Sequence, residues 1–230
     1  RKRKSGTNRT RKSRRRKYTA KRSKSRKYRI DNELFTAVAK GNDEELTRML
    51  NPETVDETEP RGRTLAYTAA YYGHEGCLSQ LIGANADLDI AESVHGYTPA
   101  YIASEKDHEG CLRLLIEAGA DPNQASSSGR TPVYIASRKN HEGCLIRLIK
   151  AGANLNQTTS EGRTPAYTAS EKGNIGCLYM LIKAGANFKK ADRFGHTPYD
   201  IAKINRHDAC VDLIQSISNK PTKSATTVKS

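Results

Sequence analysis

The stretch Gly-Arg-Thr-Pro-Val-Tyr-Ile-Ala-Ser, residues 129–137, decides the fold of this 230-residue chain because it recurs at a fixed interval. Close copies begin at Gly96, Gly162 and Gly195, and a looser copy begins at Gly62. The threonines of successive copies are 33 residues apart, except in the first step, which is 34. A period of this size indicates a stack of similar supersecondary units, and such stacks present binding surfaces more often than active sites.

Each copy also carries the signals of two helices. A threonine followed by a proline is typical of a helix start. The threonine hydroxyl accepts a hydrogen bond from a free backbone N–H, and the N–H that proline lacks would have no partner at the first helical position. Such starts occur at Thr98, Thr131, Thr164 and Thr197. Apolar residues at three- and four-residue spacing, such as Leu112, Leu115 and Ile116, predict a second helix with one buried face. Residues that readily adopt the left-handed backbone conformation are expected to end the second helices. They are Gly119, Gly152, Gly185 and Asn85.

These features resemble those of the ankyrin-repeat family. The pattern Gly-x-Thr-Pro-x-x-x-Ala, followed by an apolar segment that ends in Leu-Ile-x-Ala-Gly-Ala, is typical of ankyrin repeats and extends over residues 31 to about 216. The resemblance implies an all-α ankyrin-repeat solenoid of helix-turn-helix units with projecting hairpin-like fingers. It also implies a concave groove, formed by the first helices and the fingers, that receives a partner protein.

The chain departs from the family at the histidine that usually follows Thr-Pro. Tyrosine stands there instead, and we place Tyr67, Tyr101, Tyr134, Tyr167 and Tyr199 in this slot. A smaller residue beside a larger one roughly keeps the core volume, so we expect the fold to survive. The hydrogen bonds between repeats that the family's histidine provides must then come from another source.

We expect six units, of which the outer two cap the stack. The first unit keeps the apolar pattern but lacks the Thr-Pro start. The predicted organisation is a disordered or nucleic-acid-bound basic arm at residues 1–30, a capping repeat at 31–60, four full repeats at 61–194, a capping repeat at 195–218 and a disordered tail at 219–230.

Positive charge is concentrated in the arm. Residues 1–30 contain 17 of the 39 Lys and Arg residues and no acid, whereas residues 31–219 have 19 basic and 25 acidic side chains and a net charge of −6. A segment so basic and so poor in apolar residues is expected to stay disordered until it meets a polyanion. Because each neutralised phosphate releases counterions, we expect salt-dependent binding to RNA or DNA with little sequence preference.

Two tyrosines lie among the arm's cations and could stack on unpaired bases. The predicted nucleic-acid-binding residues are Arg1, Lys2, Arg3, Lys4, Arg11, Lys12, Arg14, Arg15, Arg16, Lys17, Tyr18, Lys21, Arg22, Lys24, Arg26, Lys27, Tyr28 and Arg29. A nuclear import signal or a solubilising tail is the alternative interpretation. A mitochondrial transit peptide or a polybasic membrane anchor fits less well, because Ile30 is the only large aliphatic residue in the arm.

Cysteine and histidine each recur once per unit, which indicates framework positions. The cysteines are Cys77, Cys111, Cys144, Cys177 and Cys210, and the histidines that open the second helices are His74, His108, His141 and His207. Packed helices lie about 8 to 10 Å apart, too far for a disulfide or for shared zinc coordination. We therefore expect no metal, no cofactor and no catalytic residue. Free thiols indicate a reducing compartment, the nucleus or the cytoplasm.

Positions that vary between units predict the contacts with a partner protein. On the first helices these are Tyr71, Tyr72, Glu105, Lys106, Arg138, Lys139, Glu171, Lys172 and Lys203. Tyr71 and Tyr72 are the leading candidates because adjacent exposed tyrosines are rigid anchors, unless one of them packs beneath the first finger. The alternating charges favour a protein over a phosphate backbone. Further candidates near the fingers are His95, Tyr97, Arg130, Arg163, Phe188 and Phe194.

The sequence thus predicts a non-enzymatic adaptor whose groove binds a protein and whose arm binds nucleic acid. The alternative is an architectural component of a ribosome, a virion or a similar particle, with the arm threaded through RNA or DNA. A substrate receptor for another enzyme is a third hypothesis, but we find no recruiting motif. No segment approaches the ~20 apolar residues of a membrane-spanning helix, so we expect no membrane partner.

Overall fold

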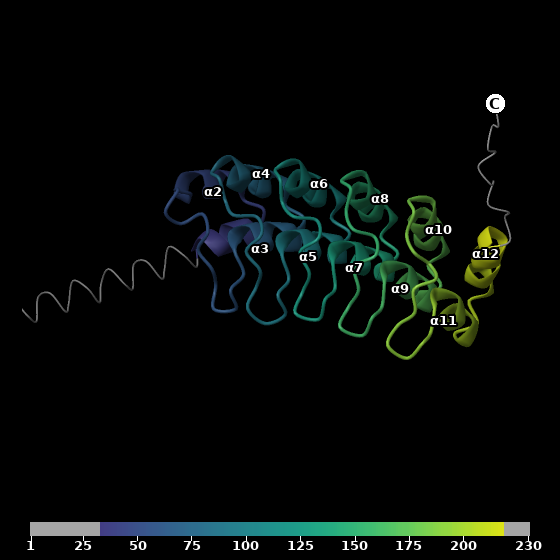
Figure 1. Ribbon diagram of the computed structural model, residues 1–230. Helices are drawn as coiled ribbons and strands as arrows, with labels where there is room; N and C mark the ends of the chain where they lie inside the picture. Colours follow the sequence, from purple (N-terminus) through teal and green to yellow (C-terminus); the bar gives the residue numbers. More distant parts are fainter. Residues whose placement is uncertain (1–32, 219–230) are drawn as a thin grey trace, which may run out of the picture.

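The computed structural model describes residues 33–218, which form a stack of six helix pairs (Figure 1). The first unit pairs a helix over residues 33–39 with α2 (Asp43–Met49). The later units pair α3 (Leu65–Tyr72) with α4 (Glu75–Gly83), α5 (Pro99–Lys106) with α6 (Glu109–Glu117), α7 (Pro132–Lys139) with α8 (Glu142–Lys150), α9 (Pro165–Lys172) with α10 (Ile175–Lys183), and α11 (Pro198–Ile204) with α12 (Asp208–Ser218). The predicted all-α repeat fold is confirmed, whereas the predictions for the arm and the tail lie outside the described residues.

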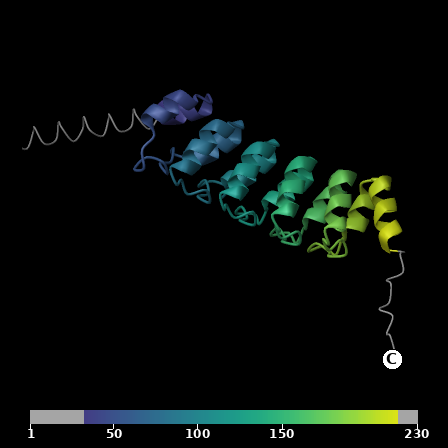
Figure 2. The same cartoon turned by 90° about the horizontal axis from the view of Figure 1, so that it is seen from above.

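The helices form two layers, with a row of loops beyond one of them. In Figure 1 the second helices α4, α6, α8 and α10 lie in one row and the first helices α3, α5, α7 and α9 lie in the next. The loops between units project past the first helices. Figure 2 shows the units following one another along the stack. The main helix contacts join helices of the same or of adjacent units, as expected for a solenoid.

A threonine cap starts each first helix from α3 onward. In α5 the hydroxyl of Thr98 accepts a hydrogen bond from the backbone N–H of Tyr101 (3.1 Å), and Pro99 occupies the first helical position. Equivalent caps are formed by Thr64, Thr131, Thr164 and Thr197. The predicted helix starts are therefore confirmed.

One prediction is wrong in α11, the first helix of the sixth unit. Tyr199 is the second residue after Thr197 and not the third, so it does not share the slot of Tyr101. The third residue is Asp200, whose carboxylate accepts hydrogen bonds from the backbone N–H (2.9 Å) and the hydroxyl (2.6 Å) of Thr197. This capping box puts a polar group where the inner units have a buried tyrosine.

Left-handed residues follow both helices of most units. After the second helices they are Asn85, Gly119, Gly152 and Gly185, as predicted. After the first helices they are Gly73, Asp107, Asn140 and Gly173, with φ between 61° and 79°. The residues that end the first helices are not among the helix ends predicted from the sequence. Asp107 and Asn140 fit it because their short polar side chains tolerate the left-handed conformation.

The fingers are short hairpins that are hydrogen-bonded to one another. They comprise residues 59–63, 92–97, 126–130, 159–163 and 192–196. For example, the backbone N–H of Ser127 donates to the carbonyl of His95 (2.8 Å) in the preceding finger. The extra residue of the 34-residue step lies in the 92–97 finger, which is one residue longer than the others.

The histidines that open the second helices supply hydrogen bonds between units. A ring nitrogen of each lies 2.9 to 3.2 Å from a carbonyl oxygen at the end of the preceding first helix. In the fifth unit Asn174 takes the histidine's place and donates to the carbonyl of Ser137 (2.8 Å). These contacts satisfy carbonyls that a helix end leaves free. Together with the bonds between fingers, they supply hydrogen bonds between repeats in a chain that has tyrosine in place of the family's usual histidine.

The second helices supply the same buried residues in every full unit. In α8 these are Cys144, Leu145 and Leu148, all of which have no exposed surface. The equivalent side chains of the neighbouring units belong to the same continuous core. Burial in each unit therefore depends on the units on either side.

We predict that Leu148→Ala destabilises the protein by about 2 to 5 kcal/mol, because it opens a cavity between three packed units. Leu213→Ala, in the terminal helix α12, should cost less because Leu213 is only partly buried. Unfolding in denaturant, followed by circular dichroism, measures both losses. Equal losses at the two sites would contradict a stack held together by contacts between neighbours.

Candidate functional site

A cleft of about 430 Å³ lies between the 59–63 and 92–97 fingers and the first helices α3 and α5. Three of its lining residues are tyrosines, so we call it the tyrosine cleft. Its lining includes Tyr67, Tyr71, Tyr97, His95, Glu92 and Glu105. Arg61 and Arg63 line it as well, so the cleft combines aromatic surface with charges of both signs, a combination suited to recognising a polar or charged side chain.

Stacked rings form the walls of the tyrosine cleft. Tyr97 lies on the fully buried Tyr101, with ring centroids 4.2 Å apart and an interplanar angle of 6°. The ring of His95 lies 5.1 Å from that of Tyr97. On the other side Tyr67 and Tyr71 stack at 6.4 Å. The outer rings are thus held in place by rings packed behind them.

The two leading candidates from the sequence have different surroundings. Tyr71 is half-buried in the cleft, its ring lies edge-on to that of Tyr72 (4.9 Å), and the Nζ of Lys106 lies 4.7 Å from its centroid. Tyr72 is 51% exposed. The alternative that one tyrosine packs beside the fingers therefore applies to Tyr71, and Tyr72 is the more accessible of the two.

The remaining candidates on the first helices lie in equivalent pairs. Glu105, Arg138 and Glu171 are half-buried, and the residues that follow them, Lys106, Lys139 and Lys172, are exposed. The second residue of each pair is thus the more exposed of the two. Their roles as contact residues remain predictions.

Two exposed apolar side chains lie at the C-terminal end of this surface. Lys203 is exposed but lies one position before the slot of Glu105 and Glu171, and that slot is filled by Ile204, which is 59% exposed. Phe194 is 60% exposed in the last finger. Phe188 instead packs against the core. Counting seven residues from Thr197 would have identified Ile204 from the sequence.

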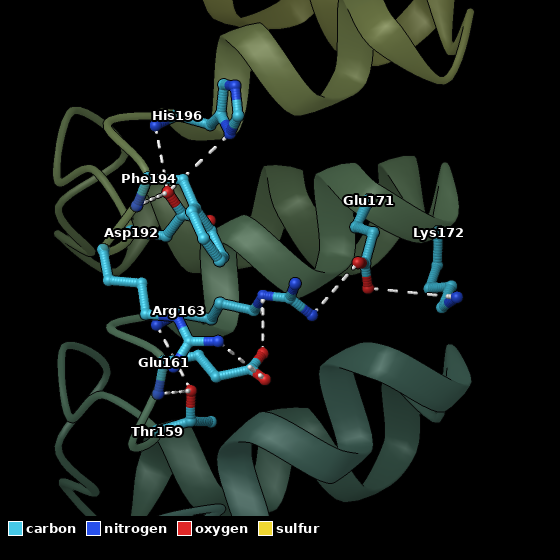
Figure 3. Close-up of polar contacts among 9 residues, drawn as sticks. Thr159, Glu161, Arg163, Glu171, Lys172, Asp192, Phe194 and His196 are labelled. Carbon is cyan, nitrogen blue, oxygen red and sulfur yellow. Dashed lines mark hydrogen bonds and ion pairs between the residues drawn. The ribbon is translucent and has the colours of Figure 1, made fainter.

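An arginine of the fifth unit joins the finger to the first helix (Figure 3). The Nε of Arg163 lies 3.2 Å from a carboxylate oxygen of Glu161 in its own finger, and a terminal nitrogen lies 3.4 Å from a carboxylate oxygen of Glu171 in α9. The central carbon of the guanidinium is 5.4 Å from the centroid of the Tyr167 ring. Burial would lower the pKa of Arg163, but Glu171 and Glu161 outweigh that effect and raise it above its ordinary value. The arginine is therefore a fixed internal cation.

The two positions of Arg163 and Glu171, one before the capping threonine and seven after it, carry different charges in the third and fourth units. In the third unit Tyr97 replaces the arginine and Glu105 replaces Glu171, and Glu105 has no ion pair or hydrogen bond within residues 33–218. In the fourth unit both slots hold arginine, Arg130 and Arg138, and neither forms an ion pair among the described residues. Unpaired charges of opposite sign thus occupy neighbouring units.

Glu92 organises the longer finger. It is 5% exposed, and its carboxylate accepts hydrogen bonds from the backbone N–H groups of Val94 (2.8 Å), His95 (2.5 Å) and Tyr97 (3.4 Å). Burial would raise the pKa of Glu92, but these three bonds together outweigh burial and hold it below its ordinary value. The ionised carboxylate is therefore part of the folded finger.

The five cysteines are free and buried, one in each second helix from α4 to α12. Burial raises the pKa of the Cys77, Cys111 and Cys177 thiols to about 12. Among the described residues no group of three or more His, Cys, Asp and Glu side chains is placed to hold a metal ion. The thiols thus have the environment of core residues.

The geometry defines a helical solenoid with a row of fingers over its first helices, and the comparison with family models identifies it further. The model of ankyrin repeats (3 copies) matches residues 34–126 and 133–224. The chain therefore belongs to the ankyrin-repeat family. No individual curated protein matches the chain.

Membership of this family makes the chain a protein-interaction scaffold. We call the surface formed by the fingers and the C-terminal ends of the first helices the finger-facing surface; it includes Tyr72, Glu105 and Ile204, and the tyrosine cleft lies within it. Among the helices of residues 33–218, none combines the length and the apolar character needed to span a membrane.

We predict that a thiol reagent labels the native protein slowly at all five cysteines and completely after unfolding, because the raised pKa keeps the buried thiols protonated. Mass spectrometry of quenched samples measures labelling at each site. Rapid reaction of a single cysteine in the native protein would indicate a redox or catalytic role for it.

We also predict a contribution of Glu92 to acid stability. Because its folded-state pKa is lowered, the stabilisation is fully present above the ordinary glutamate pKa of about 4.3 and is lost as the pH falls through the folded-state value. Glu92→Gln should therefore lower stability at neutral pH and flatten its decline in acid, as measured by thermal unfolding across pH. Glu44→Gln, at an exposed position of α2, is the control.

Proposed function

We propose that this chain is a non-enzymatic adaptor that holds a partner protein on its finger-facing surface and nucleic acid on its N-terminal arm. The observation that carries the proposal is a separation of charge along the chain. Residues 33–218 form a scaffold with accessible side chains beside the fingers, and residues 1–30 hold 17 of the 39 Lys and Arg residues.

The protein half of the proposal rests on side chains that the repeat framework does not use. Tyr72, Lys139 and Ile204 are exposed at the ends of first helices, where they do not contribute to the continuous core. Tyrosine is one of the residue types that contribute most of the energy of protein interfaces, so Tyr72 is the leading contact residue. The charged residues beside them, Glu105 and Arg138, add complementarity and select between partners.

The nucleic-acid half rests on charge alone. The arm has no acidic residue, and 22 basic and 25 acidic side chains follow it. A polyanion is therefore attracted to the arm rather than to the scaffold as a whole. The free thiols favour a reducing compartment such as the nucleus or the cytoplasm.

We predict that replacing all 17 Lys and Arg residues of the arm by Gln abolishes most binding to RNA and DNA, because the counterion release is lost. Fluorescence anisotropy with a short labelled RNA strand and a short DNA duplex measures the affinity. Wild-type affinity should fall about a thousandfold from low to physiological salt. Undiminished binding by the substituted protein would contradict the division of roles.

Tyr72→Ala should have the opposite effect and weaken protein binding while retaining nucleic acid. Pull-downs from nuclease-treated lysate at high salt, quantified by mass spectrometry, compare the wild type with this variant. Tyr179→Ala is the matched control, since Tyr179 is 47% exposed but lies on a second helix, α10. Equal losses in the two variants would argue against the finger-facing surface as the interface.

A further inference from the structure

The third and fifth units differ in one respect that bears on what the tyrosine cleft binds. In the fifth unit the guanidinium of Arg163 lies near the ring of Tyr167 and is paired with Glu171. In the third unit the equivalent tyrosine and glutamate are present, as Tyr101 and Glu105, but the arginine is replaced by Tyr97. The third unit thus retains the acidic partner of an arginine without the arginine.

We propose that the tyrosine cleft binds a cationic side chain, preferably an arginine guanidinium, presented by a segment of the partner protein. The incoming guanidinium would pair with Glu105 and lie against the ring of Tyr97. The inference rests on the proposed function, because it specifies which chemistry of a protein partner the finger-facing surface selects.

In the part of the chain that the structure describes, the cations around the cleft form no ion pair with Glu105. Arg61 and Arg63 both line the cleft, and Arg61 forms no ion pair among residues 33–218. Arg63, at the rim of the cleft, is 3.0 Å from Glu59 and 5.8 Å from the centroid of Tyr67. The ammonium of Lys106 lies over Tyr71 and not within 4.0 Å of Glu105. Within residues 33–218, Arg130 and Arg138 of the fourth unit form no ion pair with Glu105 either.

The other carboxylate of the cleft is already engaged. Glu92 accepts three backbone N–H groups of its own finger and is almost fully buried. It still contributes negative charge beside the rings, which strengthens the attraction for a cation. Glu105, only half-buried, is the carboxylate that a ligand can reach.

Aromatic surface and carboxylate together favour guanidinium over other cations. A guanidinium is planar, is weakly hydrated and stacks on an aromatic ring while its N–H groups donate to a carboxylate. Tyr97 presents such a ring because it is stacked on Tyr101 behind it. The 92–97 finger, with its additional residue, bounds the cleft on one side.

The proposal is tested by titrating N-acetyl-arginine N-methylamide into the full chain with isotope-labelled tyrosine rings, followed by NMR. The citrulline analogue, which has the same shape but no charge, is the control ligand. We expect saturable shifts of Tyr71 and Tyr97 with the arginine probe, and at least about a fivefold weaker response with the citrulline probe, as expected for loss of a cation–π contact and an ion pair.

Three variants locate the binding. Glu105→Gln should weaken arginine binding about fivefold or more. Glu171→Gln, in the same slot but paired internally, should leave it unchanged. Tyr97→Arg should abolish it, because the new arginine would pair with Glu105 as Arg163 pairs with Glu171.

Equal shifts with both probes, or full binding by Glu105→Gln, would overturn the proposal. Binding that appears only after the arm's Lys and Arg residues are replaced by Gln would also overturn it, since the chain's own arm would then be the occupant. These outcomes are separate from failure of the proposed function. That failure would appear as protein partners lost equally in Tyr72→Ala and Tyr179→Ala, whatever the arginine probe does.

Discussion

The constraint on which this structure depends is that no unit can bury its apolar face alone. Leu148 and its counterparts in the other second helices are covered only because another unit lies on each side. The histidine hydrogen bonds act across the same boundaries, since the ring of His108 reaches the carbonyl of Tyr71 in the preceding unit. Sequence in the core and at these contacts is therefore fixed by neighbours, which explains its repetition.

The same constraint determines where the units can differ. The exposed side chains at the ends of the first helices and in the fingers lie outside the continuous core, so substitutions there change the surface without opening the stack. One inserted residue lengthens the 92–97 finger, and Glu92 holds this finger together through three N–H groups of the finger itself. A local change in chain length thus becomes part of the wall of a cleft, while the helices beneath it keep their positions.

The fold was predictable because its signals are local, and the site was only partly so. Thr98 with Pro99, and Gly119, specify a helix start and a helix end within a few residues. The sequence also predicts Glu105 as a contact residue on a first helix and Tyr97 as a candidate near the fingers. It does not predict the cleft, because the cleft depends on the stacking of Tyr97 on Tyr101 and on two neighbouring fingers. Tyr71 and Tyr72 look alike in sequence, and only packing distinguishes them.

The proposed selectivity of the third unit needs only one change from the fifth. A partner that used Glu171 would first have to displace Arg163, whereas a partner that used Glu105 would break no ion pair among the described residues. Leaving Glu105 unpaired costs the fold little, because partly exposed ion pairs contribute about 0 to 1 kcal/mol. The stacking of Tyr97 on Tyr101 offsets that loss, since aromatic pairs contribute about 0.5 to 1.5 kcal/mol. Exchanging arginine for tyrosine in this slot therefore converts an internal contact into a binding position without weakening the repeat.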